Sequence, residues 1–221
     1  MRFVLEPLLQ AHQVEDWSRA LSREDTSWLP GADTAGWHAR SVKRNHQLDR
    51  RSPLHAQLAS QVQATLLAHP LMQAAALPVA IHGVLFSRSS VGEGYGSHVD
   101  NAFMTGGRSD LSFTLFLSDP ETYSGGELVL ESPTGEEALR CPAGHALVYP
   151  STQLHRVEPV RDGVRLAAVG WIQSRVRRAD QRELLFELDT ARRAIFQRDG
   201  KDEIFDLISR SYTNLLRQWG E

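Results

Sequence analysis

The stretch Tyr95-Gly96-Ser97-His98-Val99-Asp100-Asn101-Ala102 decides the fold, because it places an imidazole and a carboxylate two positions apart in a segment of β character. Residues i and i+2 of a β-strand point to the same side of a sheet. His98 and Asp100 can therefore face one cavity, and His155 from a later strand can complete a set of two imidazoles and one carboxylate. Such a set occupies one side of an octahedral metal ion and leaves the other positions open.

Short β-like runs alternate with glycine- and proline-containing turns on both sides of this stretch, which predicts strands rather than helices. The runs are Val79–Phe86, Tyr95–Asp100, Leu111–Leu117, Glu127–Glu131, Glu137–Arg140, Ala146–Tyr149, Leu154–Val160 and Arg165–Ile172. Strands at this spacing predict a mainly β fold with flanking helices, a double-stranded β-helix (jelly roll) of the cupin-like kind. His98 and His155 would then meet from different strands at the barrel mouth, a usual place for a small-ligand site.

The chain before these runs has a different period. Met1–Leu5 predicts a short strand, and Glu6–Leu21 has apolar residues at helical spacing. Ser22–Leu48 is rich in Gly, Asp, Thr and Pro and predicts a loop with one possible strand. Pro53–Leu67 predicts a second helix, with a further helical turn after Pro70.

After Gln173 the β pattern stops, and two amphipathic segments, Arg178–Arg198 and Asp202–Trp219, predict a C-terminal helical hairpin. We therefore expect one domain over residues 1–177, with its core at 79–173, and the hairpin over 178–221. The hairpin either covers one face of the barrel or joins copies of the chain into a homo-oligomer, and the sequence leaves both open.

Composition excludes several classes of partner. The formal net charge is −3, from 24 basic and 27 acidic residues, so no overall field attracts nucleic acid or an anionic membrane. The single cysteine, Cys141, cannot form an intramolecular disulfide and fits a reducing compartment. No apolar run near the N-terminus is long enough for a signal peptide or a membrane helix, and a cytoplasmic location is expected.

Arg165 stands in the otherwise apolar strand Val164–Val169, ten residues after His155. A guanidinium that points into a barrel needs an anion, and its planar fork matches a carboxylate. A ligand carboxylate is therefore the simplest partner. The alternatives are that Arg165 faces solvent or pairs with a carboxylate of the protein.

The combination of these motifs, in this order, resembles the PKHD-type hydroxylases, the bacterial, PiuC-like branch of the prolyl 4-hydroxylase-like Fe(II)/2-oxoglutarate-dependent dioxygenases. The segments that carry the resemblance, besides Tyr95–Ala102 and Arg165, are Leu115–Pro120, Ser124–Leu128, Tyr149–Ser151 and Leu154–Val157.

This resemblance implies a double-stranded β-helix in which His98, Asp100 and His155 hold Fe(II). It implies that 2-oxoglutarate chelates the iron and that Arg165 binds its distal carboxylate. The implied reaction uses O2 to hydroxylate a C–H bond and converts 2-oxoglutarate to succinate, with ascorbate as a further expected cofactor. The expected substrate is a peptidyl proline, an amino acid or another small molecule, and relatives suggest a link to iron homeostasis.

One position departs from the family pattern. Relatives usually carry a tyrosine that reaches the co-substrate where this chain has Ser89. Without that phenol, we expect the co-substrate to depend more on Arg165 and on the hydroxyl of Tyr95 or Thr114. The polar loop from Ala102 to Asp110 is a candidate lid over the site.

Two other classes of protein remain open at this stage. One is a cupin-type metal protein without 2-oxoglutarate chemistry, although such sites generally use more histidines. The other is a non-catalytic sensor of iron or 2-oxoglutarate that signals through the C-terminal helices.

Overall fold

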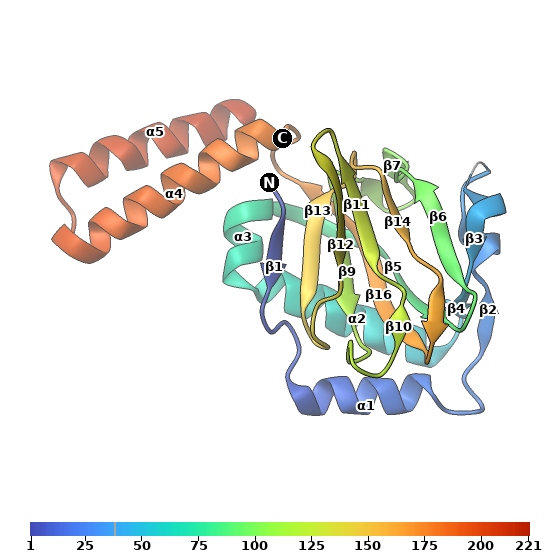
Figure 1. Ribbon diagram of the computed structural model, residues 1–221. Coiled ribbons are helices and arrows are strands. Elements are labelled where there is room, and N and C mark those ends of the chain that lie inside the picture. The colour runs from blue at the N-terminus through green and yellow to red at the C-terminus, as the bar shows by residue number, and fades with distance from the viewer. Residues whose placement is uncertain (38) are drawn as a thin grey trace.

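The computed structural model describes residues 1–37 and 39–221, and its centre is a pair of antiparallel β-sheets packed face to face (Figure 1). The larger sheet has the strand order β1 (Phe3–Leu5), β13 (Ala146–Pro150), β9 (Leu111–Phe116), β16 (Arg165–Ser174), β5 (Pro78–Ser89), β4 (His46–Leu48) and β2 (Trp28–Pro30). The smaller sheet has the order β12 (Gly135–Leu139), β11 (Leu128–Ser132), β14 (His155–Val157), β6 (Gly94–His98) and β3 (Lys43–Arg44). The predicted double-stranded β-helix is confirmed.

Two further pairs of short strands close the ends of the barrel. They are β10 (Ser124–Gly125) with β15 (Val160–Asp162), and β7 (Phe103–Met104) with β8 (Gly107–Arg108). The predicted run Leu154–Val160 is thus divided between β14 and β15. Glu158 and Pro159 lie between them, where proline has no N–H for a ladder.

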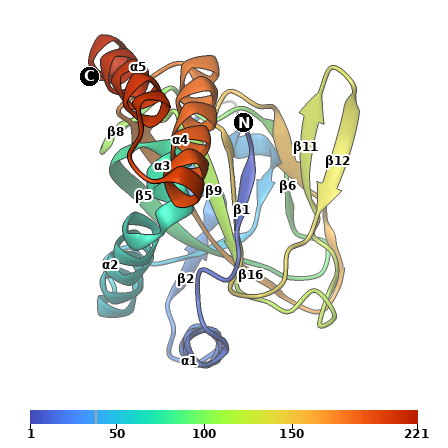
Figure 2. The same ribbon diagram turned by 90° about the vertical axis from the view of Figure 1, so that its left-hand side faces the viewer.

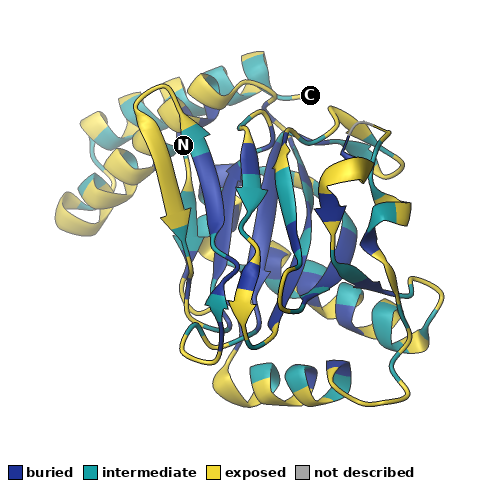
Figure 3. Ribbon diagram, turned by 45° about the vertical axis from the view of Figure 1, so that its right-hand side comes forward, coloured by how far each residue is buried: buried dark blue, intermediate teal, exposed yellow. Residues whose placement is uncertain are grey.

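Apolar and polar side chains alternate along the central strand β9, with the apolar ones in the core beneath the helices and the polar ones in the cavity between the two sheets. On β9, Leu111, Phe113 and Leu115 belong to the core beneath the helices, whereas Ser112 and Thr114 line a cavity between the sheets. Because successive side chains of a strand point to opposite faces, one face of the larger sheet anchors the fold and the other carries polar groups. Figure 3 shows this buried sheet at the centre of the molecule.

Helices α2 (Pro53–Ala68) and α3 (Pro70–Ala76) lie along the outer side of the larger sheet, and α1 (Ala11–Leu21) lies across one end of the strands (Figures 1 and 2). Helices α2 and α3 agree with the prediction, and Ser52 caps α2 by accepting a hydrogen bond from the backbone N–H of His55 at 3.2 Å.

The predicted start of the first helix at Glu6 is wrong, because α1 begins at Ala11. The backbone N–H groups of Leu8 and Leu9 donate to the carbonyl of Gly144 at 2.8 and 3.0 Å. Gln10 then caps the helix through Gln13, whose side chain accepts its backbone N–H at 3.0 Å. A tertiary contact therefore takes the backbone donors that a longer helix would use.

The segment 22–48, expected to be mostly loop, contributes β2, β3 and β4 and two short 3-10 helices, Gly31–Thr34 and Arg40–Val42. These strands of two or three residues are too short to show alternation in the sequence. β3 forms on the edge of β6 and β4 on the edge of β5, and β2 then pairs with β4.

The C-terminal helical hairpin is confirmed as α4 (Ala179–Asp199) and α5 (Glu203–Trp219). It packs against α3 and extends away from the barrel rather than over either sheet (Figures 1 and 2). Leu185 on α4 is fully buried, whereas no residue of α5 is buried. None of the helices in residues 1–37 and 39–221 is both long and apolar enough to span a membrane.

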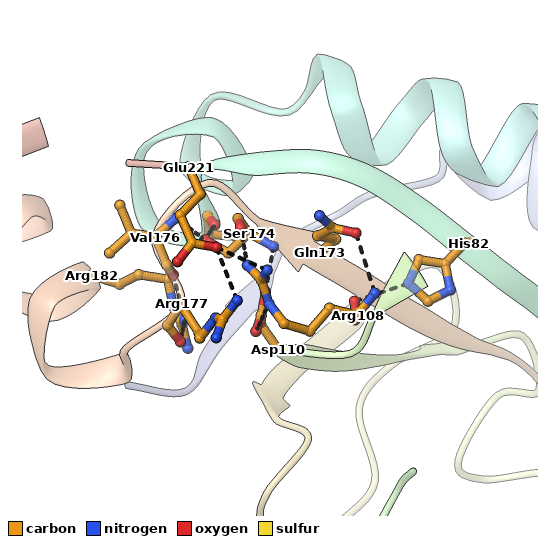
Figure 4. Close-up of polar contacts among 10 residues, drawn as sticks. His82, Arg108, Asp110, Gln173, Ser174, Val176, Arg177, Arg182 and Glu221 are labelled. Atoms are coloured by element: carbon orange, nitrogen blue, oxygen red, sulfur yellow. Dashed lines mark hydrogen bonds and ion pairs between the residues drawn. The ribbon is translucent and has the colours of Figure 1, made fainter. Parts of the chain in front are cut away.

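The end of the chain returns to the barrel beside the predicted lid (Figure 4). Arg108, on the loop 102–110, contacts the Asp110 carboxylate at 2.8 Å and the Glu221 carboxylate at 3.2 Å. Its backbone carbonyl lies 3.1 Å from Nε2 of His82. The second half of the loop is therefore held in place by the barrel and by the C-terminal residue together.

Candidate active site

His98 and His155 lie directly opposite each other on the paired strands β6 and β14. Their ring centroids are 4.2 Å apart, and Nε2 of His155 is 3.9 Å from Oδ2 of Asp100. The sequence predicted that Asp100 lies within the strand Tyr95–Asp100. In the structure β6 ends at His98, and Asp100 lies two residues beyond it. One ligand atom from each of the three side chains nevertheless lies within 4.8 Å of the others.

Both imidazoles are oriented by backbone carbonyls. Nδ1 of His98 lies 2.8 Å from the carbonyl of Gly96, and Nδ1 of His155 lies 2.9 Å from the carbonyl of Gln153. When Nδ1 donates to a carbonyl, Nε2 keeps its lone pair for a metal. Burial and the neighbouring His155 lower the pKa of His98 to about 4, which keeps its ring neutral near pH 7.

Asp100 is oriented by two serines that the sequence analysis did not single out. The hydroxyl of Ser112 donates to Oδ2 of Asp100 at 2.5 Å and lies 2.8 Å from the hydroxyl of Ser151. A hydroxyl carries one proton, so Ser112 donates to Asp100 and accepts from Ser151. Only the alternation of β9 hints at this role, since Ser112 is polar among apolar neighbours.

Arg165 is buried, with 2% of its surface exposed, which excludes the alternative that it faces solvent. Its Nε and Nη2 atoms have no hydrogen-bond partner, and no carboxylate of residues 1–37 or 39–221 lies within ion-pair distance of it. Burial lowers the pKa of this guanidinium. Two adjacent unpaired donors on a buried cation fit a bidentate carboxylate ligand.

Two buried tyrosines lie near Arg165, and both were missed from the sequence. Burial raises the pKa of Tyr123 and of Tyr149, and the guanidinium opposes both shifts. Among the described residues, no group makes a geometrically satisfactory hydrogen bond with the Tyr123 hydroxyl, although the Arg165 guanidinium lies close to it. Ser89 pairs with Arg165 across β5 and β16. The position at which relatives usually carry a tyrosine is therefore next to Arg165. Tyr123 and Tyr149 supply phenols in this region from other elements.

Gly126 keeps the space beside Arg165 open. A Cβ at this position would approach Cδ of Arg165 to 2.9 Å and the ring of Tyr123 to 3.2 Å. Its φ of 65° also disfavours any other residue.

Tyr95 and Thr114 occupy different parts of the same cavity. Tyr95 stacks on His98, with ring centroids 3.6 Å apart and planes inclined by 20°. Thr114 is buried on β9 next to Tyr149. The cavity measures about 560 Å³, and all six predicted site residues line it.

Comparison with known structures shows the fold, and a match to a family of sequences gives the class of protein. The chain superposes on a Pseudomonas putida prolyl-4-hydroxylase with a TM-score of 0.55 and 19% identity, over 79% of this chain and 92% of that one. It superposes on HygX of Streptomyces hygroscopicus, solved with nickel, 2-oxoglutarate and hygromycin B, with a TM-score of 0.57 and 15% identity, over 78% and 82% of the two chains. Residues 84–173 match the 2OG-Fe(II) oxygenase superfamily. Fold and sequence together define an Fe(II)- and 2-oxoglutarate-dependent oxygenase.

The family within this class follows from the whole chain. Residues 180–221 match the PKHD-type hydroxylase C-terminal domain. A PKHD-type hydroxylase of Acaryochloris marina is 50% identical over 221 residues, which cover all of both chains. The chain belongs to the PKHD-type hydroxylases. It is an enzyme that uses Fe(II), 2-oxoglutarate and O2 to hydroxylate a C–H bond, as the resemblance implied.

Proposed function

We propose that His98, Asp100 and His155 hold the Fe(II) of this dioxygenase and that Arg165 binds the distal carboxylate of 2-oxoglutarate. The observation that carries the proposal is the convergence of three oriented ligands in one cavity with a buried, unpaired guanidinium. Two imidazoles and one carboxylate are the donor set that suits ferrous iron.

The bound iron and 2-oxoglutarate supply the oxidising chemistry, with succinate and CO2 as by-products. The chain's own residues bind and orient. The carbonyls of Gly96 and Gln153 set the imidazole tautomers, and Ser112 holds the carboxylate. Tyr95 and Thr114 stay proposed contacts of the co-substrate region. The buried wall that carries Arg165 and Tyr149 excludes water from the inner end of the cavity.

Anaerobic titration with Fe(II) and 2-oxoglutarate tests these roles through the weak visible charge-transfer band of the chelate. We expect the band in the wild-type enzyme, no retained iron in Asp100→Ala, and a shift to much higher 2-oxoglutarate concentration in Arg165→Ala. Succinate formation by Asp100→Ala at the wild-type rate would reject the ligand assignment. An unchanged titration of Arg165→Ala would reject the carboxylate assignment.

We also propose that residues 178–221 form a separate C-terminal unit that joins copies of the chain. The support is the hairpin's projection from the barrel and the exposed apolar residues of α5, Ile204 at 57% and Leu207 at 54%. Light scattering should show an assembly larger than one chain, and Leu207→Asp should shift it toward the monomer. A wild-type monomer would refute this. Ascorbate dependence, the cytoplasmic location and the link to iron homeostasis stay predictions.

A further inference from the structure

The outer end of the active-site cavity carries more positive charge than the proposed iron chemistry uses. Three basic side chains, Lys43, Arg50 and Arg165, line the cavity, whereas Asp100 is the only carboxylate among its described lining residues. Arg165 lies at the proposed co-substrate end. Lys43 lies on β3 and Arg50 between β4 and α2, and neither has a role in the functions assigned above.

Lys43 is buried, with 8% of its surface exposed. Its Nζ lies 5.0 Å from the centre of the Tyr95 ring and donates to the hydroxyl of Thr34 at 3.1 Å. An ammonium has three N–H donors, and this hydrogen bond uses one. No carboxylate of residues 1–37 or 39–221 lies within ion-pair distance, and burial lowers the pKa of Lys43 to about 8. The fold thus keeps an incompletely paired ammonium inside the cavity, at a cost in stability.

The position of Lys43 places it beside the proposed metal site. Lys43 pairs with Tyr95 across β3 and β6, and the Tyr95 ring stacks on the imidazole of His98. One aromatic residue therefore contacts both Lys43 and His98. A small molecule with an anionic group at Lys43 would therefore lie beside the proposed metal ligands, in the cavity that Lys43, His98, Asp100 and His155 all line.

Charge balance gives the sign of the missing ligand. The two charges of Fe(II) and the guanidinium of Arg165 are offset by Asp100 and the two carboxylates of 2-oxoglutarate. The charges of Lys43 and Arg50 are then left over. Arg50 is exposed, and within the described parts of the chain it also lacks an ion-pair partner. For the buried Lys43, uncompensated charge is costly and a bound counter-charge relieves it, whereas the exposed Arg50 is solvated and would only add attraction for the same anion.

We propose that Lys43, assisted by Arg50, binds a carboxylate of the primary substrate, so that the substrate is a small organic acid such as a free amino acid rather than an internal residue of a peptide. This inference rests on the proposed function for the choice of substrate, whereas anion binding at Lys43 is independent of it. The competing view is that Lys43 only packs on Tyr95 to hold β3 in place.

The first test needs neither metal nor turnover. Lys43 and Lys201 are the only two lysines among the 24 basic residues, so lysine side-chain ¹³C labelling gives one signal for the site and one internal control. The metal-free enzyme is titrated with N-acetylglycine and, separately, with N-acetylglycinamide, which lacks the carboxylate. We expect a saturable shift of the Lys43 signal with the acid only, no shift of Lys201, and a weaker response in Arg50→Gln.

An Arg165→Met background separates the two proposed carboxylate sites. A response of Lys43 that survives in this variant places the acid at Lys43. A response lost with Arg165, equal responses of the two lysines, or no saturable response of Lys43 overturns the proposal.

The second test uses the iron-loaded enzyme and the twenty amino acids paired with their amides. Succinate formation is measured for wild type, Lys43→Met and the control Lys201→Met. We expect stimulation by an acid over its amide, and a loss of about 10–100-fold in kcat/KM for Lys43→Met, the value of one charge-assisted hydrogen bond. The proposal is overturned if an acid and its amide stimulate succinate formation equally, or if an acid stimulates wild type and Lys43→Met equally.

The rate of succinate formation without added amino acid separates a failure of the Lys43 proposal from a failure of the proposed function. If wild type forms no succinate even slowly and shows no charge-transfer band, the roles of His98, Asp100, His155 and Arg165 fail. The Lys43 proposal is then still decided by the metal-free titration.

Discussion

Replacing Arg165 with methionine should weaken 2-oxoglutarate binding while leaving the ligand-free protein as stable as before or more so. Within residues 1–37 and 39–221, Nε and Nη2 of Arg165 have no hydrogen-bond partner. Two charge-assisted hydrogen bonds to a carboxylate contribute about 3–6 kcal/mol, so their loss should raise the Kd for 2-oxoglutarate about 10²–10⁴-fold. Methionine nearly fills the same volume and removes a buried, unpaired charge, which is neutral or stabilising.

The two halves of this prediction are measured separately. Anaerobic titration of the charge-transfer band gives the Kd, and thermal unfolding without iron or 2-oxoglutarate gives the stability. About 1 kcal/mol corresponds to roughly 2–4 °C in Tm for a chain of this size. Arg161→Met serves as the control, because Arg161 is an exposed arginine four positions away, with only a 3.6 Å contact to Glu127. An unchanged Kd, or a Tm lowered by many degrees, would refute the reasoning.

Three further outcomes follow from the same contacts. Ser112→Ala removes the hydroxyl that orients Asp100 and should weaken iron about 10–100-fold in competition with a ferrous chelator; equal affinity would contradict this role. Because the pKa of Lys43 is lowered to about 8 from 10.5, the unfolded chain holds its proton over an interval in which the folded chain has lost it. The free energy of unfolding of wild type relative to Lys43→Met should therefore rise with pH between these two pKa values, by up to roughly 3 kcal/mol, and should not change at lower pH. Urea unfolding at a series of pH values measures this difference. A difference that does not change with pH would contradict the reasoning. Arg108→Met breaks a nearly buried ion pair within the candidate lid and should cost about 3 kcal/mol in urea unfolding, whereas Glu221→Gln affects a pair whose carboxylate is exposed and should cost less than about 1 kcal/mol; similar losses would show that the contact of Glu221 matters more than its exposure suggests.

Several elements could be predicted because their signals are local. The two C-terminal helices and α2 have apolar residues at helical spacing, and α2 begins at a serine followed by a proline. The strands of the barrel show runs of β-forming residues between glycine turns. Helix α1 was predicted too long because Gly144, distant in the sequence, takes the backbone donors of Leu8 and Leu9.

The site likewise contains residues that the local sequence reveals and residues that only the fold reveals. His98 and Asp100 are two positions apart, and their shared direction follows from strand geometry even though β6 ends at His98. Lys43 and the tyrosines near Arg165 carry no such signal, since nothing in their neighbours distinguishes them from packing residues. They become recognisable only when the sheets place them in one cavity.

The sequence by itself predicted the class of fold, a metal site formed by His98, Asp100 and His155, and an anionic partner for Arg165, because these predictions depend on residue type and short spacing. Tertiary structure decided what surrounds them. Pairing of β3 with β6 brings Lys43 onto Tyr95, and pairing of β16 with β5 sets Arg165 opposite Ser89. Such contacts join residues far apart along the chain, and register between strands is a property of the folded sheet that no local pattern contains.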